Sequence, residues 1–261
     1  MDAITTAAAP PRLRINRLLP YWAVLQADFK ATFHSWIYRV WVLLSVGVAV
    51  GYLLYRFGAK QVSGMIQSAP DTIGDLLHWV IYGSTTLVIA LTAGAICSER
   101  GTMADSVLSR GISRYQYFLG KWHARLSLVL ITYFVQGILA LVCAYYMLHS
   151  EAMTIHGSLV AMLVVAALLV FVVTFGVSVS AVSSNTLVSI VVVWMTIYGG
   201  GFIVSQLPGA LPSPERAMRN LPNILKGWYD WTVLSRLMLT SLGLSAGAAL
   251  IGMFCFSRRD V

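Results

Sequence analysis

Long apolar runs separated by short polar segments dominate the pattern of this chain. The runs cover residues 40–55, 76–96, 126–148, 158–182, 187–207 and 237–256. Each is long enough, or nearly so, to cross about 30 Å of hydrocarbon as a helix that rises about 1.5 Å per residue. None contains Asp, Glu, Lys or Arg, as expected when an ionised side chain at mid-helix costs about 2.5–3.5 kcal/mol on insertion. The pattern predicts an all-α membrane protein of six transmembrane helices, because backbone groups find no water partners in lipid.

A second helical pattern precedes the first span. Apolar residues recur there every three or four positions, at Leu18, Trp22, Leu25, Phe29, Phe33 and Trp36. Between them lie the polar residues Gln26, Asp28, Lys30 and His34. With Pro20 in its first turn, this pattern predicts an N-terminal amphipathic helix that lies in the membrane interface. We therefore divide the chain into an N-terminal tail and interfacial helix at 1–36 and a six-span domain at 37–261.

The segment between the last two spans has helix signals of its own. Ser213, followed by Pro214 and Glu215, predicts a helix start. An apolar face follows at Ile224, Leu225, Trp228, Trp231 and Leu234. We expect one or two short helices that touch or dip into the membrane there.

Composition supports a membrane environment. Of the 261 residues, 58% are hydrophobic and 11% are charged, whereas soluble domains carry about 25% charged residues. A water-soluble fold with this balance would expose large apolar patches. The first apolar run begins near residue 37, too late and too long for a cleaved signal peptide, so we interpret it as a retained span.

The distribution of positive charge orients the predicted helices. Twelve of the 18 Lys and Arg residues fall in the N-terminal segment, the loop between spans two and three, and the C-terminal tail. Since cytoplasmic loops carry the excess of Lys and Arg, we expect both termini in the cytoplasm and segment 208–236 outside. The net charge of +8 has this origin, and no basic run with interleaved aromatic residues stands apart from the spans. Nucleic acid is therefore not an expected partner.

Groups for covalent chemistry are missing from the predicted spans. Away from the ends of the spans, their polar side chains are hydroxyls and Gln136, whereas proton relays and membrane enzymes place ionisable groups at depth. The phosphate-binding pattern GxxxxGK[ST] does not occur in the sequence. We expect a non-catalytic membrane subunit with no metal site and no cofactor of its own. A haem- or metal-handling subunit stays open as an alternative, because His78 and His149 could approach one another as a bis-histidine pair.

The loop between spans two and three has the most ordered polar pattern. Gly101 fits a helix end, Thr102 fits the N-cap of a new helix, and Asp105 would lie in the first turn, where the helix dipole favours an acid. We predict a short helix there, a break at Gly111 and a new helix after Ser113.

Glu99 stands at the predicted end of span two, where the helix dipole disfavours an acid. It therefore requires a cationic partner. Arg110 or Arg114 is close enough in sequence to provide one.

The residues of this loop carry a resemblance to a known family. The order Glu99-x-Gly101-Thr102, Leu108-Ser109, Ile112-Ser113-Arg114 and Leu119-Gly120-Lys121 is similar to that of ABC-2 type transporter permeases. The closing Phe256-Ser257-Arg258-Arg259-Asp260 and the outer Leu221-Pro222 with Gly227 also resemble that family.

The resemblance implies that the loop forms a cytoplasmic coupling helix, which docks on an ATPase subunit. The residues that it assigns to this role are Glu99, Gly101, Thr102, Asp105, Leu108, Arg110, Arg114 and Lys121. Leu108 would be the buried anchor of the contact, and Arg110 and Arg114 would pair with acids at its rim. The amphipathic helix before span one would be the interfacial connecting helix of the family.

The implied function is that of a permease subunit of an ATP-driven transporter in a bacterial cytoplasmic (inner) membrane. Export is favoured, because the chain lacks the EAA-type loop of small-solute importers. The implied partners are separate ABC ATPase subunits, which would bind ATP and Mg, and a second permease copy or a related chain. A non-transporting transmission subunit, acting on a periplasmic partner, stays open as an alternative.

Small residues suggest where helices meet or bend. Gly47 and Gly51 in the first span, and Gly243 and Gly247 in the sixth, form GxxxG pairs that permit close helix approach. Three consecutive glycines, Gly199, Gly200 and Gly201, predict a hinge in the fifth span or its end.

Overall fold

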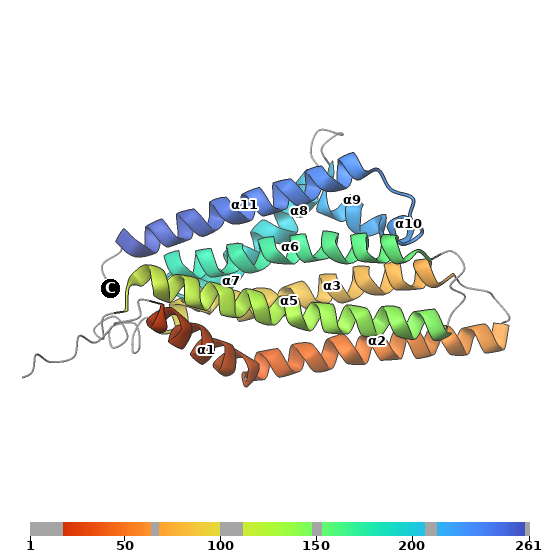
Figure 1. The fold of residues 1–261 in the computed structure, drawn as a ribbon, viewed down its shortest axis with the longest axis horizontal. Coiled ribbons are helices and arrows are strands. Elements are labelled where there is room, and N and C mark those ends of the chain that lie inside the picture. Colours follow the sequence, from red (N-terminus) through yellow and green to blue (C-terminus); the bar gives the residue numbers. More distant parts are fainter. Residues whose placement is uncertain (1–17, 64–67, 100–111, 148–152, 207–212, 259–261) are drawn as a thin grey trace, which may run out of the picture.

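The computed structural model describes residues 18–63, 68–99, 112–147, 153–206 and 213–258, which are helical and contain no β-strand. The elements are α1 (Leu19–Phe33), α2 (Trp36–Ser63), α3 (Ala69–Ala93), η1 (Cys97–Glu99), α5 (Arg114–Met147), α6 (Ile155–Val182), α7 (Thr186–Trp194), η2 (Met195–Gly199), α8 (Gly200–Gln206), α9 (Pro214–Arg219), α10 (Leu221–Leu225) and α11 (Trp231–Arg258). The long helices run side by side along the molecule (Figure 1).

Within these described ranges, six helical segments are long and apolar enough to cross a membrane. They are Trp36–Ala59, Ala69–Glu99, Arg114–Tyr146, Ile155–Val182, Thr186–Gln206 and Trp231–Arg258. Large apolar side chains face outward from them, among them Leu43, Leu139 and Leu250. The sequence prediction of a multi-pass, all-α membrane protein is confirmed at this level.

The helices extend beyond the apolar runs that predicted them. The first predicted span, residues 40–55, lies inside α2, which has 28 residues. Its additional turns carry charge, and the Arg56 guanidinium lies 3.1 Å from the Asp75 carboxylate of α3. In the other direction, α3 ends at Ala93, three residues before the predicted end of the second span, and the chain continues through a turn into η1.

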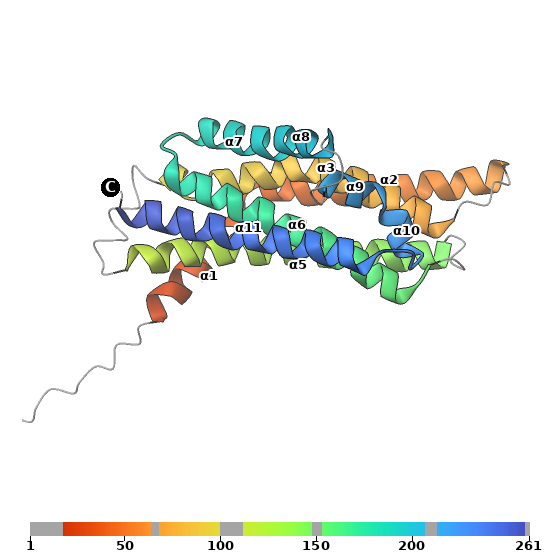
Figure 2. The same ribbon diagram turned by 90° about the horizontal axis from the view of Figure 1, so that it is seen from above.

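Helix α6 forms the centre of the bundle, where it packs against α11, α3 and α5. Its valines Val164, Val165, Val173 and Val177 are fully buried. The fifth span, formed by α7, η2 and α8, lies at the edge of the bundle (Figure 2). Few of its side chains are buried, so most of its surface is left to face lipid.

Two distinct ends follow from this arrangement. Helix α1, the start of α5 and the end of α11 lie at one end of the bundle, whereas α9 and α10 lie toward the other (Figure 1). We call the first the loop end, because residues 99 and 112 flank the loop there, and the second the α9–α10 end. Residues 18 and 258 lie at the same end, as the predicted even number of spans requires.

The segment before α11 forms two short helices, as its sequence predicted. The Ser213 hydroxyl caps α9 by accepting a hydrogen bond from the Arg216 backbone N–H, and Pro214 occupies the first turn.

The expected membrane contact of this segment is only partly right. Leu221, Ile224 and Leu225 are buried, because α10 packs against α3 and α6. Trp228 and Trp231 are the exposed part of the predicted apolar face.

The GxxxG pairs do not mark helix contacts inside this chain. A Cβ built on Gly47, Gly51, Gly243 or Gly247 would have nothing within 4 Å. Close approaches occur at other glycines: a Cβ at Gly74 would lie 2.5 Å from Pro222, one at Gly120 2.8 Å from Val24, and one at Gly252 2.7 Å from Ser178. The GxxxG spacing predicted close helix approach at these four glycines. Whether a glycine is required at a position depends instead on how closely a neighbouring helix lies there.

The glycine run in the fifth span does not end the helix. A π-helical turn at Met195–Gly199 leads directly into α8. The run therefore lies inside a continuous span, at the junction of the π-turn with α8.

Candidate functional site

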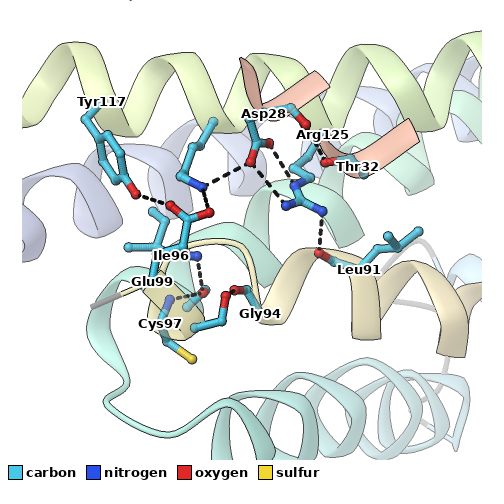
Figure 3. Close-up of polar contacts among 12 residues, drawn as sticks. Asp28, Thr32, Leu91, Gly94, Ile96, Cys97, Glu99, Tyr117 and Arg125 are labelled. Atoms are coloured by element: carbon cyan, nitrogen blue, oxygen red, sulfur yellow. Dashed lines mark hydrogen bonds and ion pairs between the residues drawn. The ribbon is translucent and has the colours of Figure 1, made fainter. Parts of the chain in front are cut away.

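A buried group of charged side chains lies at the loop end (Figure 3). It joins Asp28 of α1, Glu99 of η1, and Lys121 and Arg125 of α5. We call these four residues the ionic cluster. It lies beside the stretch 100–111, since Glu99 is the last described residue before it.

The sequence of α5 places its share of the site on one face. Tyr117, Lys121 and Arg125 follow one another at intervals of four, which stacks their side chains along one stripe of a helix. The helix begins with reciprocal caps, in which the Ser113 hydroxyl accepts from the Gln116 N–H and the Gln116 side chain accepts from the Ser113 N–H. The predicted new helix after Ser113 is confirmed.

Helix α1 supplies Asp28 from a face that the apolar pattern did not predict. Val24, Asp28 and Thr32 are buried, because this stripe packs on α5. The buried Thr32 hydroxyl donates a hydrogen bond to the Asp28 carbonyl, one turn earlier in the same helix, at 2.7 Å. The sequence pattern placed Asp28 on the polar, water-facing side, and this part of the prediction is wrong. Trp22 and Phe33 remain exposed, as an interfacial helix would require.

Asp28 is the acceptor that joins α1 to α5. Lys121 Nζ donates to Asp28 Oδ1 at 3.0 Å. The Arg125 guanidinium donates through Nε to Oδ2 at 2.9 Å and through a terminal nitrogen to Oδ1 at 3.2 Å. This two-pronged geometry fixes the orientation of both side chains.

Glu99 is held by two groups of α5. Lys121 Nζ donates to Glu99 Oε1 at 2.7 Å, and the Tyr117 hydroxyl donates to Oε2 at 2.7 Å. Lys121 therefore bridges Asp28 and Glu99, so that one ammonium group of α5 connects α1 with η1.

Backbone groups at the end of the second span are held as well (Figure 3). Arg125 donates to the Leu91 carbonyl at 3.1 Å. The Ser180 hydroxyl of α6 accepts from the N–H groups of Ile96 and Cys97 at 2.9 and 3.1 Å. These bonds satisfy backbone groups where α3 has ended, and they attach the segment before residue 100 to α5 and α6.

The burial of the ionic cluster makes its pairing obligatory. The side chains of Lys121, Asp28 and Arg125 are 3%, 4% and 13% exposed, and that of Glu99 is 33% exposed. Two cations face two anions, so the formal charges cancel. Removing one partner of a buried pair typically costs about 3–5 kcal/mol, because an uncompensated charge is left behind. The arrangement is thus a stiff connection among three helical segments.

The structure locates three of the residues predicted for coupling. Glu99 and Lys121 belong to the ionic cluster, and Lys121 supplies a cation for Glu99. The predicted pairing of Glu99 with Arg110 or Arg114 stays a prediction, because Arg110 lies outside the described residues. Arg114 donates to the Ser257 carbonyl at 3.1 Å, which connects the start of α5 to the end of α11. The others lie outside the described residues, and these are Gly101, Thr102, Asp105, Leu108 and Arg110.

Sequence reasoning did not select Asp28, Tyr117 or Arg125. The sequence feature that could have identified them is the stripe of Tyr117, Lys121 and Arg125. Two cations at the edge of a predicted span require an acidic partner. Asp28, flanked by apolar residues in a membrane-proximal helix, was the acid available.

The haem alternative remains a prediction, because His149 lies outside the described residues. The His78 ring packs against the Tyr82 ring in a tilted arrangement, with ring centroids 4.8 Å apart. In the described part of the chain, no three His, Cys, Asp or Glu side chains gather as a metal site would require.

The comparisons with protein-family models and curated proteins found no relative of this chain. No protein-family model matches the chain, and no curated protein matches it either. The fold and site define a six-helix, multi-pass membrane protein with a buried ionic connection at one end.

Proposed function

We propose that this chain is the membrane permease subunit of an ATP-driven transporter of the ABC-2 type, working as an exporter with separate ATPase subunits. The observation that supports this most is the ionic cluster, because it anchors both flanks of the loop that resembles a coupling helix. Glu99 precedes the loop and Lys121 follows it, and their side chains form an ion pair at 2.7 Å.

A coupling element needs stiff attachment to the helices that it moves. If the flanks of the loop were loosely held, a push from an ATPase would be absorbed by local rearrangement. Here the flank before the loop is bonded to α5 and α6, and α5 is bonded to α1 through Asp28. Displacement of the loop would therefore move α1, the end of α3 and the start of α5 together.

The remaining parts of the proposal rest on the resemblance of the loop to that of ABC-2 type permeases. Leu108 would be the buried anchor in the ATPase contact, with Arg110 and Arg114 at its rim. ATP and Mg would bind in the partner ATPase, and a second permease copy would complete the pathway. The loop end would face the cytoplasm of a bacterial cell and the α9–α10 end would face outward.

The experiment compares two single substitutions at opposite ends of the bundle. The chain is purified from native membranes in mild detergent, co-purifying proteins are identified by mass spectrometry, and ATP turnover of the preparation is measured. Wild type should recover an ABC ATPase with turnover, and Leu108→Asp should lose both. Trp228→Asp is the control, since Trp228 is 75% exposed near the α9–α10 end, and it should keep both.

Two results would contradict the proposal. One is a wild-type preparation that contains no ABC ATPase. The other is a Leu108→Asp preparation that retains the full complex and full turnover.

A further inference from the structure

A cavity of about 860 Å³ lies between the fifth and sixth spans, where it is bounded by α3, α6, η2, α8, α9 and α11. Its size falls within the range of about 300–1,000 Å³ that is usual for sites of small molecules. The participation of α9 and of the first half of α11 places it toward the α9–α10 end.

The walls of the cavity belong to membrane-crossing helices. α8 lines it from the fifth span and packs on η2 and α9, whereas α11 lines it from the sixth span and packs on α6 and α5. The medium around these helices in a membrane is acyl-chain hydrocarbon. An unfilled space of this size would deprive its wall atoms of contacts, so hydrocarbon is favoured to fill it.

Four of the hydroxyl groups in the walls already donate hydrogen bonds inside the protein. Thr85, Thr196 and Thr240 donate to carbonyls one turn earlier in their own helices, at 2.7, 2.8 and 2.8 Å. The Tyr198 hydroxyl donates to the Tyr82 carbonyl at 2.6 Å. Because these four hydroxyl donors are already hydrogen-bonded within the protein, the wall presents mainly carbon atoms to the cavity. It therefore suits an alkyl chain better than a polar solute.

Glycines, which have no side chain, widen the cavity. Gly200 and Gly201 line one wall, directly after the π-turn, and Gly243 lines the opposite wall. A Cβ at any of them would meet nothing within 4 Å. Larger side chains at these positions would enter open space and would not collide with the protein.

One end of the cavity is polar. Glu215 of α9 lines it, and the Arg219 guanidinium lies 2.6 Å from the Glu215 carboxylate. A hydrogen bond with the Ser205 side chain, together with Arg219, holds the pKa of the Glu215 carboxyl below its ordinary value. At neutral pH this end therefore carries both an anion and a cation, which complements a head group that also carries both.

We propose that this cavity holds an acyl chain of a zwitterionic phospholipid from the leaflet at the α9–α10 end, with the head group beside Glu215 and Arg219. The site is independent of the proposed transport function, because it needs neither an ATPase nor the loop at the other end.

The test uses the full chain in vesicles, without ATPase or ATP. The probe is phosphatidylethanolamine with a diazirine in one acyl chain, mixed with phosphatidylglycerol. After illumination, lipid adducts are mapped on the protein by mass spectrometry. We expect adducts at buried cavity-lining positions such as Leu237 of α11 and Met218 of α9, which are each 3% exposed, in addition to those on the outer surface.

Matched variants distinguish the cavity from the outer surface. Gly243→Leu should lower the cavity adducts several-fold, whereas Gly247→Leu should leave them unchanged. Both glycines have open space at Cβ, but only Gly243 lines the cavity. Gly200→Leu fills the space from the opposite wall and serves if Gly243→Leu fails to fold.

The proposal is overturned if adducts occur only at outward-facing residues such as Leu239 and Leu250, which are 69% and 61% exposed. It is also overturned if cavity adducts form in equal yield in the folded Gly243→Leu or Gly200→Leu protein and in wild type.

Discussion

Replacing Asp28 by asparagine tests the ionic cluster most sharply, because the substitution removes a charge and keeps the shape. The lost carboxylate faces Lys121 at 3.0 Å and Arg125 at 2.9 Å. Lys121 would keep Glu99 as a partner, and Arg125 would keep the Leu91 carbonyl. The cluster would nevertheless pass from balanced charge to one excess cation inside the protein.

The expected cost is about 3–5 kcal/mol of folding free energy, the usual range for breaking a buried pair on one side. The control is Asp75→Asn, which breaks an aspartate–arginine pair of the same chemistry. The Asp75 side chain is 51% exposed, so that pair should be worth about 0–1 kcal/mol. Asp28 is buried and has two cationic partners, whereas Asp75 is exposed and pairs with one, and these differences predict the different costs of the two variants.

The assay is unfolding of the purified chain by SDS in mixed micelles, followed by circular dichroism. Adding Lys121→Gln to Asp28→Asn removes the surplus cation and should recover part of the loss, so the two changes should not be additive. The reasoning is refuted if Asp28→Asn costs no more than Asp75→Asn. It is also refuted if the double variant loses the full sum of both single losses.

Three further predictions concern packing, a turn and the interfacial helix. Gly252→Ala should destabilise by about 1–3 kcal/mol, because its Cβ would lie 2.7 Å from Ser178; Gly247→Ala on the same helix should not, and equal SDS unfolding midpoints would contradict this. Gly227→Ala should cost about 1–2 kcal/mol in the same assay, since its φ of +84° lies in the left-handed region, and an unchanged midpoint would be the contrary result. Spin labels at Trp22 and Gln26 should report lipid at the first site and water at the second, and equal collision rates with oxygen and with a water-soluble nickel complex would exclude an interfacial α1.

The spans could be predicted from the sequence because their determinant is local. Whether a run of apolar residues can cross the hydrocarbon depends on its own length, and packing against another helix does not change that length. Each predicted run lies largely inside a helix of the structure, and the differences are at the ends, as at Ala93 and Ser63. There the charged turns that follow an apolar run can stay helical when they find partners, as Arg56 does.

The site was less predictable because its determinants are pairwise and distant in sequence. Glu99 required a cation, and the sequence named Arg110 and Arg114, 11 and 15 positions away. Among the described residues Lys121, 22 positions away, provides one. Helix α5 runs back along α1 and η1, and that crossing selects which cation meets which acid. The same holds for the glycines: Gly252 is required by Ser178 of α6, a contact that no spacing within α11 encodes.

The two ends of the bundle hold their charged side chains differently. At the loop end, the four charges of the ionic cluster are wholly or largely buried, and each is held by more than one partner. At the α9–α10 end, Asp75 and Asp71 pair with Arg56 and Lys226, but their carboxylates are 51% and 54% exposed. Exposed pairs of this kind are worth little and can be remade in water. The cavity, which η2 and α9 line, also lies toward this end. Removing one charged partner should therefore cost more at the loop end than at the α9–α10 end.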